Sequence, residues 1–323
     1  MAGPDRTDSS ERPNSPDGTN SPNTPDRPDG PDTPKDPDHP DAPVSRLWHS
    51  VGLARATAAD LAVLARHLVL YPTGMLPEHE HLHVQEHVQQ HVQEHARKSD
   101  PAGTHGHPRR TAAARGRPPV LLLHGFVDNR SAFSVLRRSL HEHGWPQVQA
   151  LNYSPLIGDI RTAAEMLGRH VEEVCAQSHR RRVDVVGHSL GGLIARYYVQ
   201  RLGGDHRVRT LVTLGTPHAG TRAVPVLAPH PIIRQMRPGS EVLRELAAPS
   251  PGCRTRFVAF WSDLDQLMIP AEAARLVHPD LPAENVEVSG VGHLALPVHG
   301  TVVAEIRRAL LGAGPLRPAI EAA

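Results

Sequence analysis

A single serine lies between glycines where an apolar run gives way to a helical pattern. The segment GHSLG, residues 187–191, places Ser189 at that point. Both a tight structural turn and an activated nucleophile explain such a pattern. Because side chains at positions 187 and 191 would crowd the strand and the helix, a G-x-S-x-G turn needs glycine at both. The strand–helix setting favours a nucleophile whose hydroxyl is exposed at the carboxyl edge of a sheet.

A nucleophilic serine requires a base and an acid, and both are available further along the chain. Asp263 and Asp265 follow the apolar run RFVAFW, and His293 follows the run NVEVSG, next to a glycine. In this order the histidine can take the proton of the serine while a carboxylate orients the imidazole. The chain has 23 histidines, so the position of His293 after the last strand is what singles it out.

Acyl transfer also needs backbone donors for an oxyanion. The loop in LLLHGFVDN, after the first apolar run, contains a His-Gly turn that would direct the amide of Phe126 to the substrate oxygen. The amide of Leu190 is the expected second donor. His124 in this loop is expected to orient the loop and not to act as the base.

These positions imply a parallel sheet. Apolar runs typical of strands begin near Pro118, Val148, Val183, Val208, Arg256 and Asn285, and helical patterns cover 130–143, 160–177, 190–202 and 298–311. Strands that alternate with helices predict a mostly parallel sheet with helices on both faces. Residues 118–312 are long enough for one such α/β domain. Residues 313–323 are assigned to a C-terminal tail.

The first 117 residues have a different composition. Residues 1–44 carry a proline at every third position from Pro22 to Pro43, the period of a polyproline II helix, and are predicted to be disordered. Residues 45–76 are predicted to be an amphipathic helical segment docked on the main domain. Its leucines at positions 53, 61, 64 and 68 share one face. The alternative is peripheral membrane contact through residues 46–70.

Residues 77–117 are predicted to be a histidine-rich linker. His83, His87, His91 and His95 are four apart, a spacing that can bind a transition metal through paired imidazoles. The repeated HVQE motif favours repeat expansion instead, because no carboxylate or cysteine cluster completes a site. We therefore expect neither a functional metal site nor a cofactor.

The composition indicates which partners, disulfide bonds and cellular location to expect. A net charge of +1 argues against nucleic-acid binding. Two cysteines are too few for a disulfide framework, although a single Cys175–Cys253 bridge stays open. The N-terminus lacks an apolar secretory signal, so a cytoplasmic location is expected, with peripheral membrane association as the alternative. The charges within residues 53–70 argue against a membrane span.

The segment from Pro118 to about Leu311 resembles α/β-hydrolases of the bacterial, actinobacterial-type lipase and esterase family. The similarity is carried by LLLHGF, VGHSLGG, TLGTPHAG and VSGVGHLAL. It implies that Ser189 attacks the acyl carbonyl, that His293 acts as base and then as acid, and that Asp265 orients the imidazole. Asp265 fits the family better than Asp263 because apolar residues and a proline follow it; Asp263 would brace the loop.

Within the motif TLGTPHAG, Pro217 and Gly220 are expected to shape the turn beside the nucleophile, and His218 is expected to be structural. The resemblance implies a cofactor-free serine hydrolase that cleaves carboxylic esters with an apolar acyl chain, so the expected partner is a small-molecule ester or lipid. Acyl transfer or thioester hydrolysis on the same triad remains open, because the first half-reaction is the same. A non-catalytic binding module with this fold is the alternative from another class.

The long segment between Gly220 and Arg256 is rich in apolar residues and prolines. It is predicted to form a cap over Ser189, in which Ile232 and Ile233 contact the acyl chain of the substrate. The alternative is a surface loop whose apolar residues fill gaps in the core.

Overall fold

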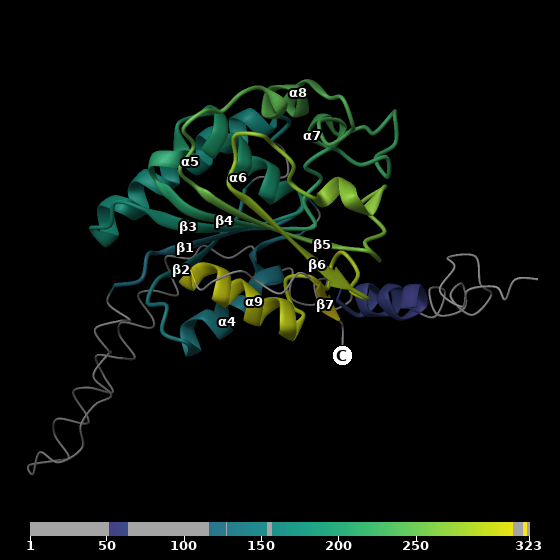
Figure 1. Ribbon diagram of the computed structural model, residues 1–323, viewed down its shortest axis with the longest axis horizontal. Coiled ribbons are helices and arrows are strands. Elements are labelled where there is room, and N and C mark those ends of the chain that lie inside the picture. The colour runs from purple at the N-terminus through teal and green to yellow at the C-terminus, as the bar shows by residue number, and fades with distance from the viewer. Residues whose placement is uncertain (1–51, 64–115, 127, 154–156, 313–318, 322–323) are drawn as a thin grey trace, which may run out of the picture.

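A seven-stranded parallel sheet forms the centre of the protein (Figure 1). The computed structural model describes residues 52–63, 116–126, 128–153, 157–312 and 319–321. The sheet order is β2-β1-β3-β4-β5-β6-β7, and every neighbouring pair is parallel. The strands are β1 (Val120–Leu123), β2 (Val148–Leu151), β3 (Val183–His188), β4 (Val208–Leu214), β5 (Arg256–Ser262), β6 (Ala283–Ser289) and β7 (Ala319–Glu321). The prediction of a parallel α/β sheet is confirmed.

Helices cover both faces of the sheet (Figure 1). One face carries α5 (Ile160–Ser178), α6 (Leu190–Arg201), α7 (Pro231–Arg234) and α8 (Glu241–Ala247), and the other carries α4 (Ser134–Glu142) and α9 (Gly300–Leu311). Short 3-10 turns lie at η1 (Arg130–Phe133), η2 (Gly204–His206) and η3 (Ala271–Ala274). The predicted helices at 130–143, 160–177, 190–202 and 298–311 therefore correspond to η1 with α4, and to α5, α6 and α9.

The two core layers follow from the alternation of side chains along each strand. In β1, Leu121 and Leu123 pack in the core layer beneath α5 and α6, while Val120 and Leu122 pack in the layer beneath α4 and α9. Because both faces of the sheet are buried, its central strands read as continuous apolar runs.

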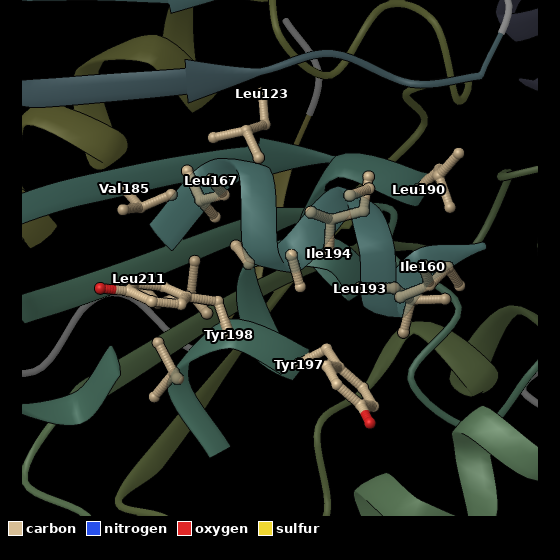
Figure 2. Packing of buried hydrophobic residues seen from close by; sticks show 14 of the residues in the cluster. Leu123, Ile160, Leu167, Val185, Leu190, Leu193, Ile194, Tyr197, Tyr198 and Leu211 are labelled. Carbon is tan, nitrogen blue, oxygen red and sulfur yellow. The ribbon is translucent and has the colours of Figure 1, made fainter. Parts of the chain in front are cut away.

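Helix α6 lies in the middle of the first layer and is buried along almost its whole length. Figure 2 shows its residues Leu193 and Ile194 among side chains of the strands and of α5, such as Leu167. A helix that is buried all round cannot shift without disturbing the core. Since Ser189 immediately precedes α6, this packing fixes the position of Ser189.

The structure corrects one boundary of the predicted organisation. Residues Ala319–Glu321, assigned above to a tail, pair with Glu287–Ser289 as β7. A strand of three residues is too short to leave a periodic pattern in the sequence. The predicted tail at 1–44 and the histidine-rich repeats at 79–95 lie outside the described residues.

Residues 52–63 form a helix, and its two described leucines, Leu53 and Leu61, do not dock on the domain; Leu64 and Leu68 of the predicted face lie outside the described residues. Leu53 is 40% exposed and Leu61 is 60% exposed, whereas Ala56 is 2% exposed. Val63 packs against the core layer beneath α4 and α9. The side of the helix that contacts the domain therefore carries Ala56, Thr57, Asp60 and Val63, while Leu53 and Leu61 are exposed.

Three further observations concern the possible disulfide bond, membrane-spanning helices and metal sites. Cys175 and Cys253 are both free thiols, so the bridge left open by the sequence is absent. Within the described part of the chain, no helix is long and apolar enough to cross a bilayer. The same residues contain no group of three or more His, Cys, Asp or Glu side chains suited to hold a metal ion.

Candidate active site

Ser189 occupies a strained turn between β3 and α6. Its backbone has φ 52° and ψ −120°, a region that residues other than glycine rarely adopt. Its amide donates a hydrogen bond to the carbonyl of Leu214 at the end of β4, with an N···O distance of 2.9 Å. The turn is thus held by the neighbouring strand, at the carboxyl edge of the sheet.

The glycines of the motif are required by close backbone contacts. A Cβ at Gly187 would lie 2.6 Å from the Cα of Gly192, and one at Gly191 would lie 2.4 Å from the carbonyl oxygen of Leu123. Both distances are shorter than any real Cβ contact, so neither position accepts a side chain. The steric reason for the G-x-S-x-G pattern is therefore the one inferred from the sequence.

A buried histidine and a buried aspartate are paired at the same edge. His293 Nδ1 lies 2.7 Å from Asp265 Oδ2, and the amides of Leu267 and Met268 donate to Asp265 Oδ1 at 2.9 and 3.1 Å. Asp263 does not reach the histidine. Its Oδ1 accepts from the amide of Gly290 at 2.9 Å and braces the end of β6.

The pair sets the proton affinity of the imidazole. Burial by itself would lower the pKa of His293, but the charge of Asp265 and its hydrogen bond outweigh burial and raise the pKa above its ordinary value. With Nδ1 engaged by Asp265, Nε2 is the nitrogen left to accept a proton from a serine.

The turn after β4 makes room for this pair. A Cβ at Gly215, where φ is 52°, would lie 2.8 Å from Asp265 Oδ2 and 3.0 Å from His293 Nδ1. The sequence motif indicated Pro217 and Gly220 as the residues that shape this turn, whereas the structure adds Gly215. The signal was present in TLGTPHAG, but only the fold reveals which glycine borders the histidine.

The loop after β1 lies against the serine. A Cβ at Gly125 would be 3.3 Å from the Cβ of Ser189, and Phe126 borders the same cavity as the serine. His124 is buried and its ring stacks on Tyr153 at a centroid distance of 4.3 Å. The Tyr153 hydroxyl donates to the carbonyl of His124. Burial lowers the pKa of His124, consistent with the predicted loop-orienting role.

The second predicted amide donor, Leu190, is the first residue of α6. The first amides of a helix have no acceptor within the helix, so they are free to bind a ligand, and the helix dipole favours negative charge there. The amides of Leu190 and Phe126 thus belong to two segments that flank Ser189.

A cavity of about 230 Å³ opens beside Ser189. Its wall includes His293, Phe126 and apolar side chains from the segment after β4 and the loop after β5, among them Val224, Pro225, Ile233, Met236, Leu267 and Met268. The segment after β4 therefore covers the serine, and it also fills the core.

The structure separates the two isoleucines that were predicted to bind substrate. Ile233 lines the cavity, whereas Ile232 is 1% exposed and packs in the core layer beneath α5 and α6. The assignment of Ile232 to the acyl pocket is wrong. In the short helix α7, consecutive residues point about 100° apart, so only one of the two can face the cavity.

A second acid–histidine contact, which the sequence does not indicate, lies beside the first. Asp128 Oδ2 lies 3.3 Å from His188 Nδ1, and both side chains are buried. His188 Nε2 in turn lies 3.1 Å from the carbonyl oxygen of His293. These contacts connect the loop after β1, the end of β3 and the histidine loop. Asp128 belongs to the quoted HGFVDN segment, but nothing local indicates its partner.

His218 is held away from the His293–Asp265 pair. Its Nε2 lies 2.9 Å from the hydroxyl of Thr213, and buried Arg196 donates to its carbonyl oxygen at 3.1 Å. Burial lowers the pKa of His218 well below its ordinary value and that of Arg196 to about 9. The buried network ties the turn after β4 to α6, as expected of a structural histidine.

Part of the chain is similar in sequence to known proteins. A family described as palmitoyl protein thioesterase matches residues 119–267. A triacylglycerol lipase of Pseudarthrobacter phenanthrenivorans is 31% identical over 116 residues, 33% of this chain and 35% of the relative. A lysosomal thioesterase PPT2 homolog of Drosophila melanogaster is 28% identical over 151 residues, 45% of this chain and 50% of the relative. The chain thus spans half or less of the length of these curated relatives.

Aspergillus fumigatus lipase B has a similar structure, with a TM-score of 0.54, 18% identity, and coverage of 63% of this chain and 54% of the lipase. This likeness concerns the fold. Together with the parallel sheet and the strained serine turn, these findings show that the chain has the α/β-hydrolase fold and that part of it is similar to a triacylglycerol lipase.

Proposed function

We propose that this protein is a serine hydrolase that cleaves carboxylic esters through an acyl-enzyme. Ser189 is the nucleophile, His293 the base and Asp265 the acid that orients it. The observation that carries the proposal is that the strained Ser189 lines the same cavity as His293, whose imidazole is paired with buried Asp265. The similarity to a triacylglycerol lipase over a third of the chain supports the same reaction class.

The reaction follows from these groups. The Ser189 hydroxyl attacks the ester carbonyl while its proton moves to Nε2 of His293, and Asp265 stabilises the imidazolium that results. The oxyanion accepts hydrogen bonds from the amides of Phe126 and Leu190. Collapse of the tetrahedral intermediate expels the alcohol, which takes the proton from His293. A water molecule, deprotonated by His293, then hydrolyses the acyl-serine.

The proposed substrate is a small-molecule ester or lipid with an apolar acyl chain. The cavity wall is largely apolar, so acyl methylene groups gain about 0.8 kcal/mol each when buried there. Its volume of about 230 Å³ lies below the range usual for drug-sized ligands. This favours a single short or medium chain. No step of the proposed reaction requires a cofactor or metal ion.

Thioester hydrolysis is the second candidate. It is supported by the match of residues 119–267 to a palmitoyl protein thioesterase family and by the similarity to a lysosomal thioesterase. A thiolate is a better leaving group than an alkoxide, and the same triad and oxyanion donors serve both reactions. The two candidates therefore differ in the leaving group that the cavity mouth accepts.

A fluorophosphonate probe, which reacts with activated serines, tests the shared chemistry. We expect the wild-type protein to be labelled, and Ser189→Ala and His293→Ala to lose labelling and turnover while keeping the wild-type circular dichroism spectrum. A panel of p-nitrophenyl esters and acyl thioesters of equal chain length then separates the two candidates. A folded wild-type protein that neither labels nor turns over any of them would reject both in favour of a binding module.

We also propose that this protein is cytoplasmic and that it contacts membranes peripherally through residues 46–70. The exposed Leu53 and Leu61 support this for the described part of that segment. Flotation with phosphatidylcholine vesicles should recover the protein, and Leu53→Ser/Leu61→Ser should reduce recovery; equal recovery of both would contradict the contact.

A further inference from the structure

The helix at residues 52–63 inserts its single carboxylate beside the loop that carries His293. Asp60 Oδ1 accepts a hydrogen bond from the amide of Ala295, with an N···O distance of 3.0 Å. A Cβ at Gly292 would lie only 2.4 Å from Asp60 Oδ2. The carboxylate thus touches the chain on both sides of His293, although 235 residues separate Asp60 from Ala295.

The same helix also contacts the loop that carries Asp265. The amide group of Gln266 donates to the hydroxyl of Thr57, with an N···O distance of 2.6 Å. Thr57 and Asp60 are three residues apart, so they lie on one face of the helix. One helix face therefore holds both the acid loop and the base loop, outside the sheet that carries them.

Asp60 also acts on the histidine through its charge. Asp265, Asp60 and Asp128 each raise the pKa of His293, against the effect of burial. Burial raises the pKa of Asp60 itself, while the amides of Ala295 and Leu294 and the neighbouring His293 oppose that rise and Asp265 adds to it. Amide donors favour the ionised carboxylate, which is the form that interacts with an imidazolium.

We propose that Asp60 is a positioning residue for His293: its carboxylate holds the loop at residues 292–295 and stabilises the imidazolium formed when Ser189 is deprotonated. The helix at residues 52–63 is then part of the catalytic unit and not only a docked extension. This inference rests on the proposed hydrolase function, since it concerns the same histidine.

Two substitutions in the full-length protein separate the two contributions of Asp60. Asp60→Ala removes both the acceptor of the Ala295 amide and the charge, whereas Asp60→Asn keeps an acceptor oxygen and removes only the charge. Arg55→Ala is the matched control, because Arg55 is an exposed charge on the same helix. Each variant is assayed with p-nitrophenyl butyrate across a range of pH.

We expect Asp60→Ala to lower kcat by about tenfold with little change in KM, because the loop that carries the base loses a charge-assisted hydrogen bond. Asp60→Asn should recover most of that loss. In both variants the acid limb of the kcat/KM profile should move to lower pH, because removal of an anion lowers the pKa of His293. Arg55→Ala should leave kcat and the limb unchanged.

A second measurement does not depend on activity. The Nδ1 proton that His293 shares with Asp265 gives a deshielded signal in the proton NMR spectrum, which is assigned by its loss in Asp265→Asn. Its titration should move to lower pH in both Asp60 variants and stay unchanged in Arg55→Ala. Wild-type titration and an unshifted acid limb in both Asp60 variants would overturn the proposal, even if Asp60→Ala melts at a lower temperature. If the wild-type protein shows no labelling or turnover, the hydrolase function fails, while this titration still decides whether Asp60 acts on His293.

Discussion

At the scale of single residues, two aspartates two positions apart have different tasks. Asp265 accepts hydrogen bonds from His293 and from two backbone amides, whereas Asp263 accepts from the amide of Gly290. We therefore expect Asp265→Asn to lower kcat about 10⁴-fold, because an amide cannot hold the imidazole in the required tautomer. Asp263→Asn should cost about tenfold or less, since one hydrogen bond to a loop amide is changed. The reverse ranking of kcat for p-nitrophenyl butyrate would assign the acid to Asp263.

The pKa of His293 predicts the response of the enzyme to pH. The imidazole must be neutral to accept the serine proton, and Asp265 raises its pKa despite burial. As pH falls through this raised pKa, kcat/KM should fall, so the acid limb should lie above about 6.5, the ordinary value for histidine. A pH–rate profile of the wild-type protein measures the limb directly. A limb at or below the ordinary value would mean that burial outweighs the carboxylates.

At the scale of elements, the cap after β4 combines two roles in adjacent residues of α7. Ile233→Ala should raise KM for octanoate esters far more than for acetate esters, because each buried methylene contributes about 0.8 kcal/mol. Ile232→Ala should instead lower the free energy of unfolding by about 2–5 kcal/mol, because it leaves a cavity in the core, and should not change chain-length preference. Urea unfolding and a chain-length series measure the two effects. If Ile233→Ala changed KM equally for both esters, the cap would only fill the core and would not bind the acyl chain.

At the scale of the whole molecule, the site draws on segments that the sheet gathers at one edge. Segments after β1, β3, β5 and β6 supply Phe126, Ser189, Asp265 and His293, and a helix far upstream braces two of them. Parallel strands place their carboxyl ends together, which is why such distant segments meet. We therefore expect the shortest active fragment of the chain to begin near residue 52.

This boundary predicts the effect of truncation. Deletion of residues 1–44 should leave kcat/KM and the melting temperature unchanged, because their proline and aspartate triplets cannot bury enough apolar surface to offset the entropy of ordering.

Treatment with EDTA should likewise leave turnover unchanged. Steady-state assays and thermal melts of the truncated and treated proteins provide the check. Loss of turnover with EDTA that zinc or calcium restores would contradict the cofactor-free mechanism.

The sequence by itself determined six of the seven strands, the main helices and the order of the candidate triad. Buried parallel strands appear as apolar runs, helices as a 3.6-residue pattern, and the serine turn as glycines forced by backbone contact, and all of these are local signals. The two glycines of the turn and the histidine after β6 could therefore be located before the fold was known.

Only the tertiary structure decided which side chains meet. Asp265 and Asp263 follow the same strand, and Ile232 and Ile233 share one helical turn, so no local pattern separates them; distances to His293 and to the cavity do. The leucines of the helix at residues 52–63 predicted the wrong contact face. A helical repeat of leucines marks an apolar face, but it does not show which face contacts the domain, because the partner of Asp60 lies 235 residues away.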